Sequence, residues 1–168
     1  MSIRPTVLTA LALGLGACGS PTENVVSDLD LMKQATASYA EIDAALAAGF
    51  VPLSECVASP DGAMGFHYGH PPRMDDATID PEAPEVLLYE PTAGGGYRLV
   101  GVEFMMHQDV WAGAGNTGTP SVAGQSFSPP NPAHPDENVR PFYTLHAWVW
   151  QDNPSGMFAP FNPSVSCD

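Results

Sequence analysis

The stretch Tyr97–His107, YRLVGVEFMMH, is the longest β-strand pattern in the sequence. Alternate side chains of a strand point to opposite faces of a sheet. One face, expected to pack in the core, carries Val100, Val102, Phe104 and Met106. The other face carries Gly101, Glu103, Met105 and His107. Glu103 therefore lies mid-strand, where an unpaired charge would cost several kcal/mol, so it must find a partner.

Three more strand patterns surround this one. EVLLYE at 85–90 precedes the glycine-rich segment 91–96, which predicts a hairpin with the long strand. AMGFHY at 63–68 places Met64, Phe66 and Tyr68 on one face and His67 on the other. PFYTLHAWVW at 141–150 is apolar on both faces, which favours a central strand.

One helix is predicted over residues 28–48. Its apolar residues recur at spacings of three and four, and Gly49 is a typical stop. Long Pro- and Gly-rich loops connect the elements, the longest at 112–140. The predicted fold class is α+β: a mainly antiparallel β-sheet, one N-terminal helix and one disulfide.

The N-terminus has the pattern of a bacterial lipoprotein signal. A basic start and the apolar run at 7–15 lead into LGAC, in which Cys18 would become the lipid-modified first residue. The run is too short for a transmembrane helix, which needs about 20 apolar residues. The alternative is an ordinary secretory signal with an unrelated cysteine.

This prediction divides the chain into a signal peptide at 1–17, a tether at 18–27 and one globular domain at 28–168. The protein would be lipid-anchored in the cell envelope. In a Gram-negative cell we expect the protein on the periplasmic side of the outer membrane, because residue 19 is glycine and not the aspartate that favours retention in the inner membrane. In a Gram-positive cell we expect the outer face of the cytoplasmic membrane.

Charge limits the partners. The 168 residues contain 19 Asp and Glu but 5 Lys and Arg, giving a formal charge of -14. Such a chain repels phosphate backbones and has no basic patch, which excludes nucleic-acid binding. Most acids fall in the helix, in residues 75–85 and in turns, where they are solvated.

Two cysteines remain after lipidation of Cys18. In an oxidising compartment, Cys56 and Cys167 are expected to form a disulfide that closes a loop of about 110 residues. A metal–thiolate pair is the alternative.

The strand interiors hold a candidate metal site. Because neighbouring strands place side chains about 5 Å apart, His67, Glu103 and His146 can converge on one ion. Two imidazoles and one carboxylate suit zinc, copper, nickel or iron(II), with an open position for water or ligand. His107 shares the Glu103 face and can complete the shell, whereas His70 joins only if the chain turns at Gly69.

Other side chains leave the chemistry open. Met64, Met74, Met105 and Met106 would favour copper(I) if they ligate, but methionines are more often core filler. The His/Glu/His group can equally be a structural polar network. Trp111, Phe142, Trp148 and Trp150 can line a ligand pocket or pack in the core. His134 is expected in a solvated loop.

Several motifs together resemble a family of uncharacterised secreted bacterial proteins. They are ECV at 55–57, MGFHY at 64–68, PEVLLYEP at 84–91, GVE at 101–103, LHAW at 145–148, NPSGMFA at 153–159 and the final SC at 166–167. The resemblance implies one domain with a Cys56–Cys167 bridge and brings no assigned activity. The sequence departs from the family after His67-Tyr68, where Gly69-His70 replace a hydrophobic residue and an asparagine.

Three functions follow as hypotheses. The first is an envelope lipoprotein that binds copper or zinc, or another small ligand. The second is a structural or interaction module without a metal. The third is a metal-dependent hydrolase or oxygenase, which needs solvent access to the His/Glu/His group.

Overall fold

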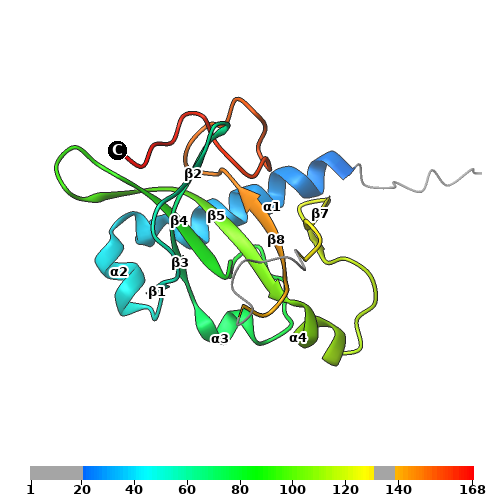
Figure 1. The fold of residues 1–168 in the computed structure, drawn as a ribbon. Coiled ribbons are helices and arrows are strands. Elements are labelled where there is room, and N and C mark those ends of the chain that lie inside the picture. The colour runs from blue at the N-terminus through cyan, green and yellow to red at the C-terminus, as the bar shows by residue number, and fades with distance from the viewer. Residues whose placement is uncertain (1–20, 131–138) are drawn as a thin grey trace, which may run out of the picture.

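The computed structural model describes residues 21–130 and 139–168. Its centre is a six-stranded sheet with the order β1-β3-β4-β5-β8, in which β2 also pairs with β3 and every pairing is antiparallel. The strands are β1 Val51–Pro52, β2 Val57–Ser59, β3 Gly62–Gly69, β4 Val86–Pro91, β5 Tyr97–His107 and β8 Phe142–Ala147. The predicted α+β class is confirmed (Figure 1).

Smaller elements surround the sheet. They are α1 Pro21–Thr36, the 3₁₀ helix η1 Ala37–Ala40, α2 Ile42–Ala47, α3 Pro71–Met74, α4 Gln108–Gly113 and the ribbon of β6 Ser121–Val122 with β7 Gln125–Ser126. In the described residues, no helix is both long and apolar enough to cross a membrane.

The prediction of one helix over 28–48 was wrong in its bounds. The helical segment starts at Pro21 rather than at residue 28, and proline is tolerated in a first turn. It is interrupted at η1 and at Glu41, whose backbone is extended. At this break the Tyr89 hydroxyl donates a 2.6 Å hydrogen bond to the Tyr39 carbonyl, a tertiary contact that competes with the helical pattern.

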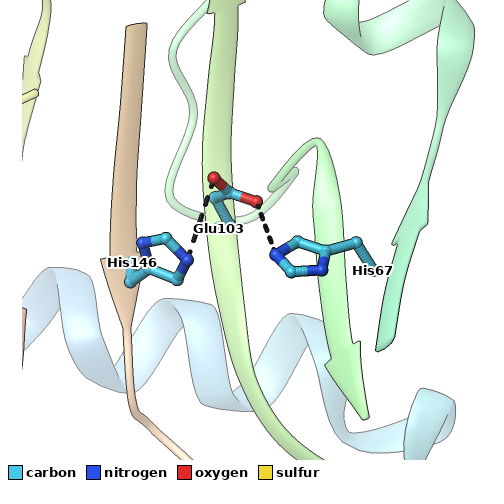
Figure 2. Close-up of side chains that lie close together, drawn as sticks. All are labelled: His67, Glu103 and His146. Atoms are coloured by element: carbon cyan, nitrogen blue, oxygen red, sulfur yellow. Dashed lines mark ion pairs between the residues drawn. The ribbon is translucent and has the colours of Figure 1, made fainter. Parts of the chain in front are cut away.

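The sheet has two buried faces. α1 crosses one face, where Met32 packs with Leu87, Val102 and Phe104 (Figure 1). The other face holds Val86, Leu88, Val100, Met105 and Trp148, together with Val165 from the C-terminal segment. The carboxylate of Glu103 belongs to this second face, away from α1 (Figure 2).

Two irregularities change the predicted faces. A bulge makes Tyr89 pair with Leu99 and Leu88 with Gly101, so Val100 packs on the second face and not with Val102. In β3, Gly65 has a φ of 90°. A glycine in that conformation interrupts strand alternation, and Met64 lines the same cavity as His67 instead of facing away from it.

β8 is an edge strand of the sheet and not the predicted central one. Its second half, Leu145–Ala147, is buried on both faces, whereas Phe142–Thr144 are half-buried. After the strand, the Trp148 indole donates a 2.7 Å hydrogen bond to the Ala159 carbonyl, and the Trp150 indole donates one to Thr36 Oγ1. The strand ends at Ala147 rather than Trp150, because the next backbone N–H groups leave the ladder: that of Trp148 donates to the Met157 carbonyl and that of Val149 to the Ala147 carbonyl.

The predicted disulfide is confirmed. Cys56 and Cys167 are bonded, with their Cα atoms 5.7 Å apart and a sequence separation of 111. Next to the bridge, the backbone N–H of Ser166 donates to the Glu90 carboxylate. The C-terminal segment is thereby held against the sheet.

Candidate metal centre

Three strands bring the candidate ligands to the second face of the sheet. Glu103 on β5 pairs directly with His146 on β8, and on its other side with Val86 on β4. His67 comes from β3, two strands from β5, and pairs with Leu88 on the intervening strand β4. Figure 2 shows the two imidazoles on opposite sides of the Glu103 carboxylate.

The ligand atoms lie close to the separations that a metal site requires. His67 Nε2 is 3.6 Å from Glu103 Oε2, and His146 Nε2 is 3.8 Å from Glu103 Oε1. All three ligand atoms fall within 4.8 Å of one another. Metal–ligand bonds of about 2 Å put the ligand atoms of a tetrahedral or trigonal ion about 3.3–3.6 Å apart. The 3.8 Å contact exceeds this range, so the side chains would have to move slightly inward to hold one ion.

The three side chains are buried and not paired with one another by hydrogen bonds. Glu103 is 3% exposed, His146 5% and His67 7%. Their contacts are too long for hydrogen bonds. Glu103 Oε2 and His146 Nε2 are buried with no hydrogen-bond partner among the described residues. Since such groups normally find partners, their common gap needs an occupant.

Ser54 orients the His67 ring. The Ser54 hydroxyl donates to the Glu55 carbonyl at 2.8 Å and contacts His67 Nδ1 at 2.9 Å. A hydroxyl has one proton, so Ser54 accepts the second bond, and His67 Nδ1 must carry the donating proton. The lone pair of the neutral ring is then at Nε2, facing Glu103. This is the arrangement that holds a metal-binding histidine through its other nitrogen.

Burial sets the charges of the group. It raises the pKa of the Glu103 carboxyl to about 8. Burial lowers the pKa of His67 to about 4, although a hydrogen bond with the Gly65 backbone raises it by a smaller amount. Burial also lowers the pKa of His146 to about 3, and the neighbouring His67 lowers it further. In the absence of a cation, these directions favour a protonated Glu103 and two neutral rings near neutral pH. The two contacts in Figure 2 are full ion pairs only when the histidines are protonated, and a cation can displace the Glu103 proton.

The group opens into a cavity of about 640 Å³. Its walls are largely apolar and come from β2, β3, β5, β8 and the adjoining loops. The side chains beyond the three ligands are Leu53, Ser54, Val57, Met64, Met74, Met105, His107, Val139, Phe142 and Thr144. An ion held by the two imidazoles and the carboxylate therefore has room for further ligands on the cavity side.

The other predicted site residues lie at different distances from the group. His107 lines the cavity but is not in the converging set of ligand atoms. His70 lies outside the cavity lining and packs edge-on against Phe50. His134 and Cys18 lie outside the described residues.

The aromatic side chains do not form a joint pocket. Phe142 lines the cavity, whereas Trp148 is buried in the second-face core, stacked on His146 with ring centroids 6.2 Å apart. Trp111 and Trp150 pack against the α1 face. The core-packing alternative therefore describes these three tryptophans.

Sequence reasoning missed Ser54. It lies between strands, and nothing in its neighbourhood signals that its hydroxyl contacts a histidine 13 residues later. It also placed Met64 on the wrong face, because the left-handed backbone of Gly65 is not visible in an alternating pattern. Both errors arise from tertiary contacts.

Comparison with family models, with curated proteins and with solved structures gives no significant match. The assignment of a function therefore depends on the geometry of the His67, Glu103 and His146 group.

Proposed function

We propose that this protein binds a copper or zinc ion through His67, Glu103 and His146. The observation that supports the proposal is the pair of unpartnered buried atoms, Glu103 Oε2 and His146 Nε2, in a set of ligand atoms within 4.8 Å. Two imidazoles and a carboxylate match the donor sets of zinc and copper sites. His107 is a further candidate ligand from the cavity wall.

A purely structural network explains the group less well. Such a network would connect its members by hydrogen bonds, because half-satisfied buried polar groups destabilise a core. The 3.6 and 3.8 Å contacts leave the network open at its centre. One ion would satisfy all three side chains at once.

Elemental analysis of protein purified without a histidine tag tests the proposal. We expect near one equivalent of metal per chain after incubation with zinc or copper and removal of excess ion. The variants His67→Ala and His146→Ala should each lose it. His70→Ala is the matched control, because His70 lies outside the cavity lining and should leave metal content unchanged. A metal-free wild-type protein, or retention of metal by both site variants, would favour the structural module.

A metal-dependent hydrolase or oxygenase is the second candidate. The observation in its favour is the cavity of about 640 Å³ that reaches the three side chains, a volume in the range of small-molecule sites. An ion with an open position there can polarise a carbonyl or activate water. Turnover of chromogenic esters by metal-loaded protein, lost in Glu103→Gln, would support this candidate. Absence of turnover would leave metal binding as the function that the group supports.

We also propose that the chain is anchored to an envelope membrane by lipid on Cys18. Its support is the sequence pattern of residues 1–18. Cys18→Ser should move the protein from the membrane fraction to the soluble fraction, and mass spectrometry should find a lipid-modified N-terminal cysteine in the wild type. If the mature protein began at another residue, the N-terminus would be an ordinary secretory signal and the proposed lipid anchor would be wrong.

A further inference from the structure

We propose that the site selects copper(I), with methionine sulfur completing a shell begun by the two imidazoles. This inference rests on the proposed metal-binding function and names the ion and the additional ligands. Glu103 would serve chiefly as the counter-charge. The sulfur donors are Met105 together with Met64 or Met74.

The positions of the methionines support this choice. Met105 follows Glu103 by two residues, so both side chains point to the same face of β5, and Met105 pairs with Thr144 beside His146. Met64 reaches the cavity because of the irregular strand at Gly65, and Met74 packs with Met105. Thioether sulfur is a soft donor that prefers copper(I) over zinc.

The other polar groups of the cavity are less suited to completing the shell. The Ser54 hydroxyl is committed to the Glu55 carbonyl and to His67. Thr144 offers a neutral hydroxyl, a weak ligand for zinc or copper. Apart from His107, the remaining donors on the described cavity wall are the three sulfur atoms.

Charge balance points to the same ion. Glu103 is the one carboxylate on the described cavity wall, and imidazole and thioether ligands are neutral. Copper(I) with one carboxylate has no net charge, whereas zinc(II) would leave one positive charge in a buried, largely apolar site. An uncompensated buried charge is costly, so a divalent ion would need an additional anion that copper(I) does not need.

Competition with a chromogenic copper(I) chelator under anaerobic, reducing conditions tests the inference. We expect the Met64→Leu/Met105→Leu double variant to bind copper(I) at least tenfold more weakly than the wild type, with zinc(II) affinity changed less than twofold. Leucine keeps the side chain apolar and similar in size. Met106→Leu is the control, because Met106 is fully buried on the α1 face, and it should bind both ions as the wild type does.

X-ray absorption at the copper edge gives an independent readout. The wild-type copper(I) protein should show sulfur scattering beside nitrogen, and the double variant should show clearly weaker sulfur scattering, because Met74 is then the remaining methionine on the described cavity wall. Unchanged copper(I) affinity in the double variant, or a wild-type spectrum without sulfur, overturns this inference. The proposed metal site would still stand if His146→Ala abolished zinc binding, and it would fail together with the inference if neither ion bound the wild type.

Discussion

Glu103 and His146 pair directly across the β5–β8 ladder, yet their side chains end 3.8 Å apart and share no hydrogen bond. Cross-strand partners with complementary polar atoms normally close such a gap. Here His67 approaches the same carboxylate from the opposite side at 3.6 Å. The carboxylate thus lies between two rings, in a group of ligand atoms that could hold one ion.

Zinc should stabilise the wild-type protein through this space. At a free concentration one hundred times its dissociation constant, a ligand that binds the folded state alone adds about 2.7 kcal/mol. We expect a rise in Tm in the wild type and none in Glu103→Gln, which keeps the shape of the side chain and removes the charged ligand. The apo proteins should have similar Tm, because Glu103 is protonated at neutral pH without a cation. Thermal unfolding with and without zinc measures both effects, and an equal rise in the variant would place the ion elsewhere.

Ser54→Ala should weaken metal binding without removing a ligand. Loss of the hydroxyl frees His67 Nδ1 and lets the ring change its tautomer and orientation. Loss of such an orienting contact typically costs 10–100-fold in metal affinity. Isothermal titration with zinc checks this, with Ser59→Ala as the control, since the Ser59 hydroxyl bonds locally near Gly62. Equal affinities for the two variants would contradict the orienting role.

Glu85→Gln should change how stability depends on pH. Burial raises the pKa of Glu85 to about 8. The backbone N–H of Met105 donates a 3.1 Å hydrogen bond to the Glu85 carboxylate and opposes this rise by a smaller amount. The unfolded chain loses this proton near pH 4.5 and the folded protein near 8, so stability falls as pH rises between these values. The slope from this one group is at most about 1.4 kcal/mol per pH unit.

Glutamine at position 85 can still accept the Met105 hydrogen bond but does not titrate. Urea unfolding of metal-free protein at pH 5, 6, 7 and 8 should therefore show a smaller decline for Glu85→Gln than for the wild type. Asp61→Asn, at an exposed turn, is the control and should leave the slope unchanged. Parallel curves for Glu85→Gln and the wild type would show that Glu85 is not protonated preferentially in the folded state.

Removing the Cys56–Cys167 bridge should destabilise the fold. In the chain-entropy model, a loop of 111 residues contributes about 4–5 kcal/mol. We expect the Cys56→Ser/Cys167→Ser double variant, or the reduced wild type, to lose most of that free energy of unfolding. Denaturant unfolding with and without reductant measures it, and identical curves would mean that the bridge is not formed in the isolated protein.

The candidate site was predictable in its members but not in its geometry. An ionisable residue inside a strand is conspicuous in sequence, which is why His67, Glu103 and His146 could be named together. Whether three strands bring them within 4.8 Å depends on register and strand order, which alternation does not specify. His107 shows the difference, since it lies on the same predicted face yet remains outside the converging set.

The sequence by itself determined the strand at 97–107, the strand around 62–69 and the Cys56–Cys167 pairing. The strands follow from local periodicity, and the pairing follows from the expectation that Cys18 is lipid-modified, which leaves two cysteines. Tertiary structure alone decided the helix break at Ala37–Ala40, the edge position of β8, the change of face at Val100 and Met64, and the contact of Ser54 with His67. Each of these features depends on a hydrogen bond or a bulge between segments far apart in the chain. The interactions that stabilise it therefore cannot be read from a local sequence pattern.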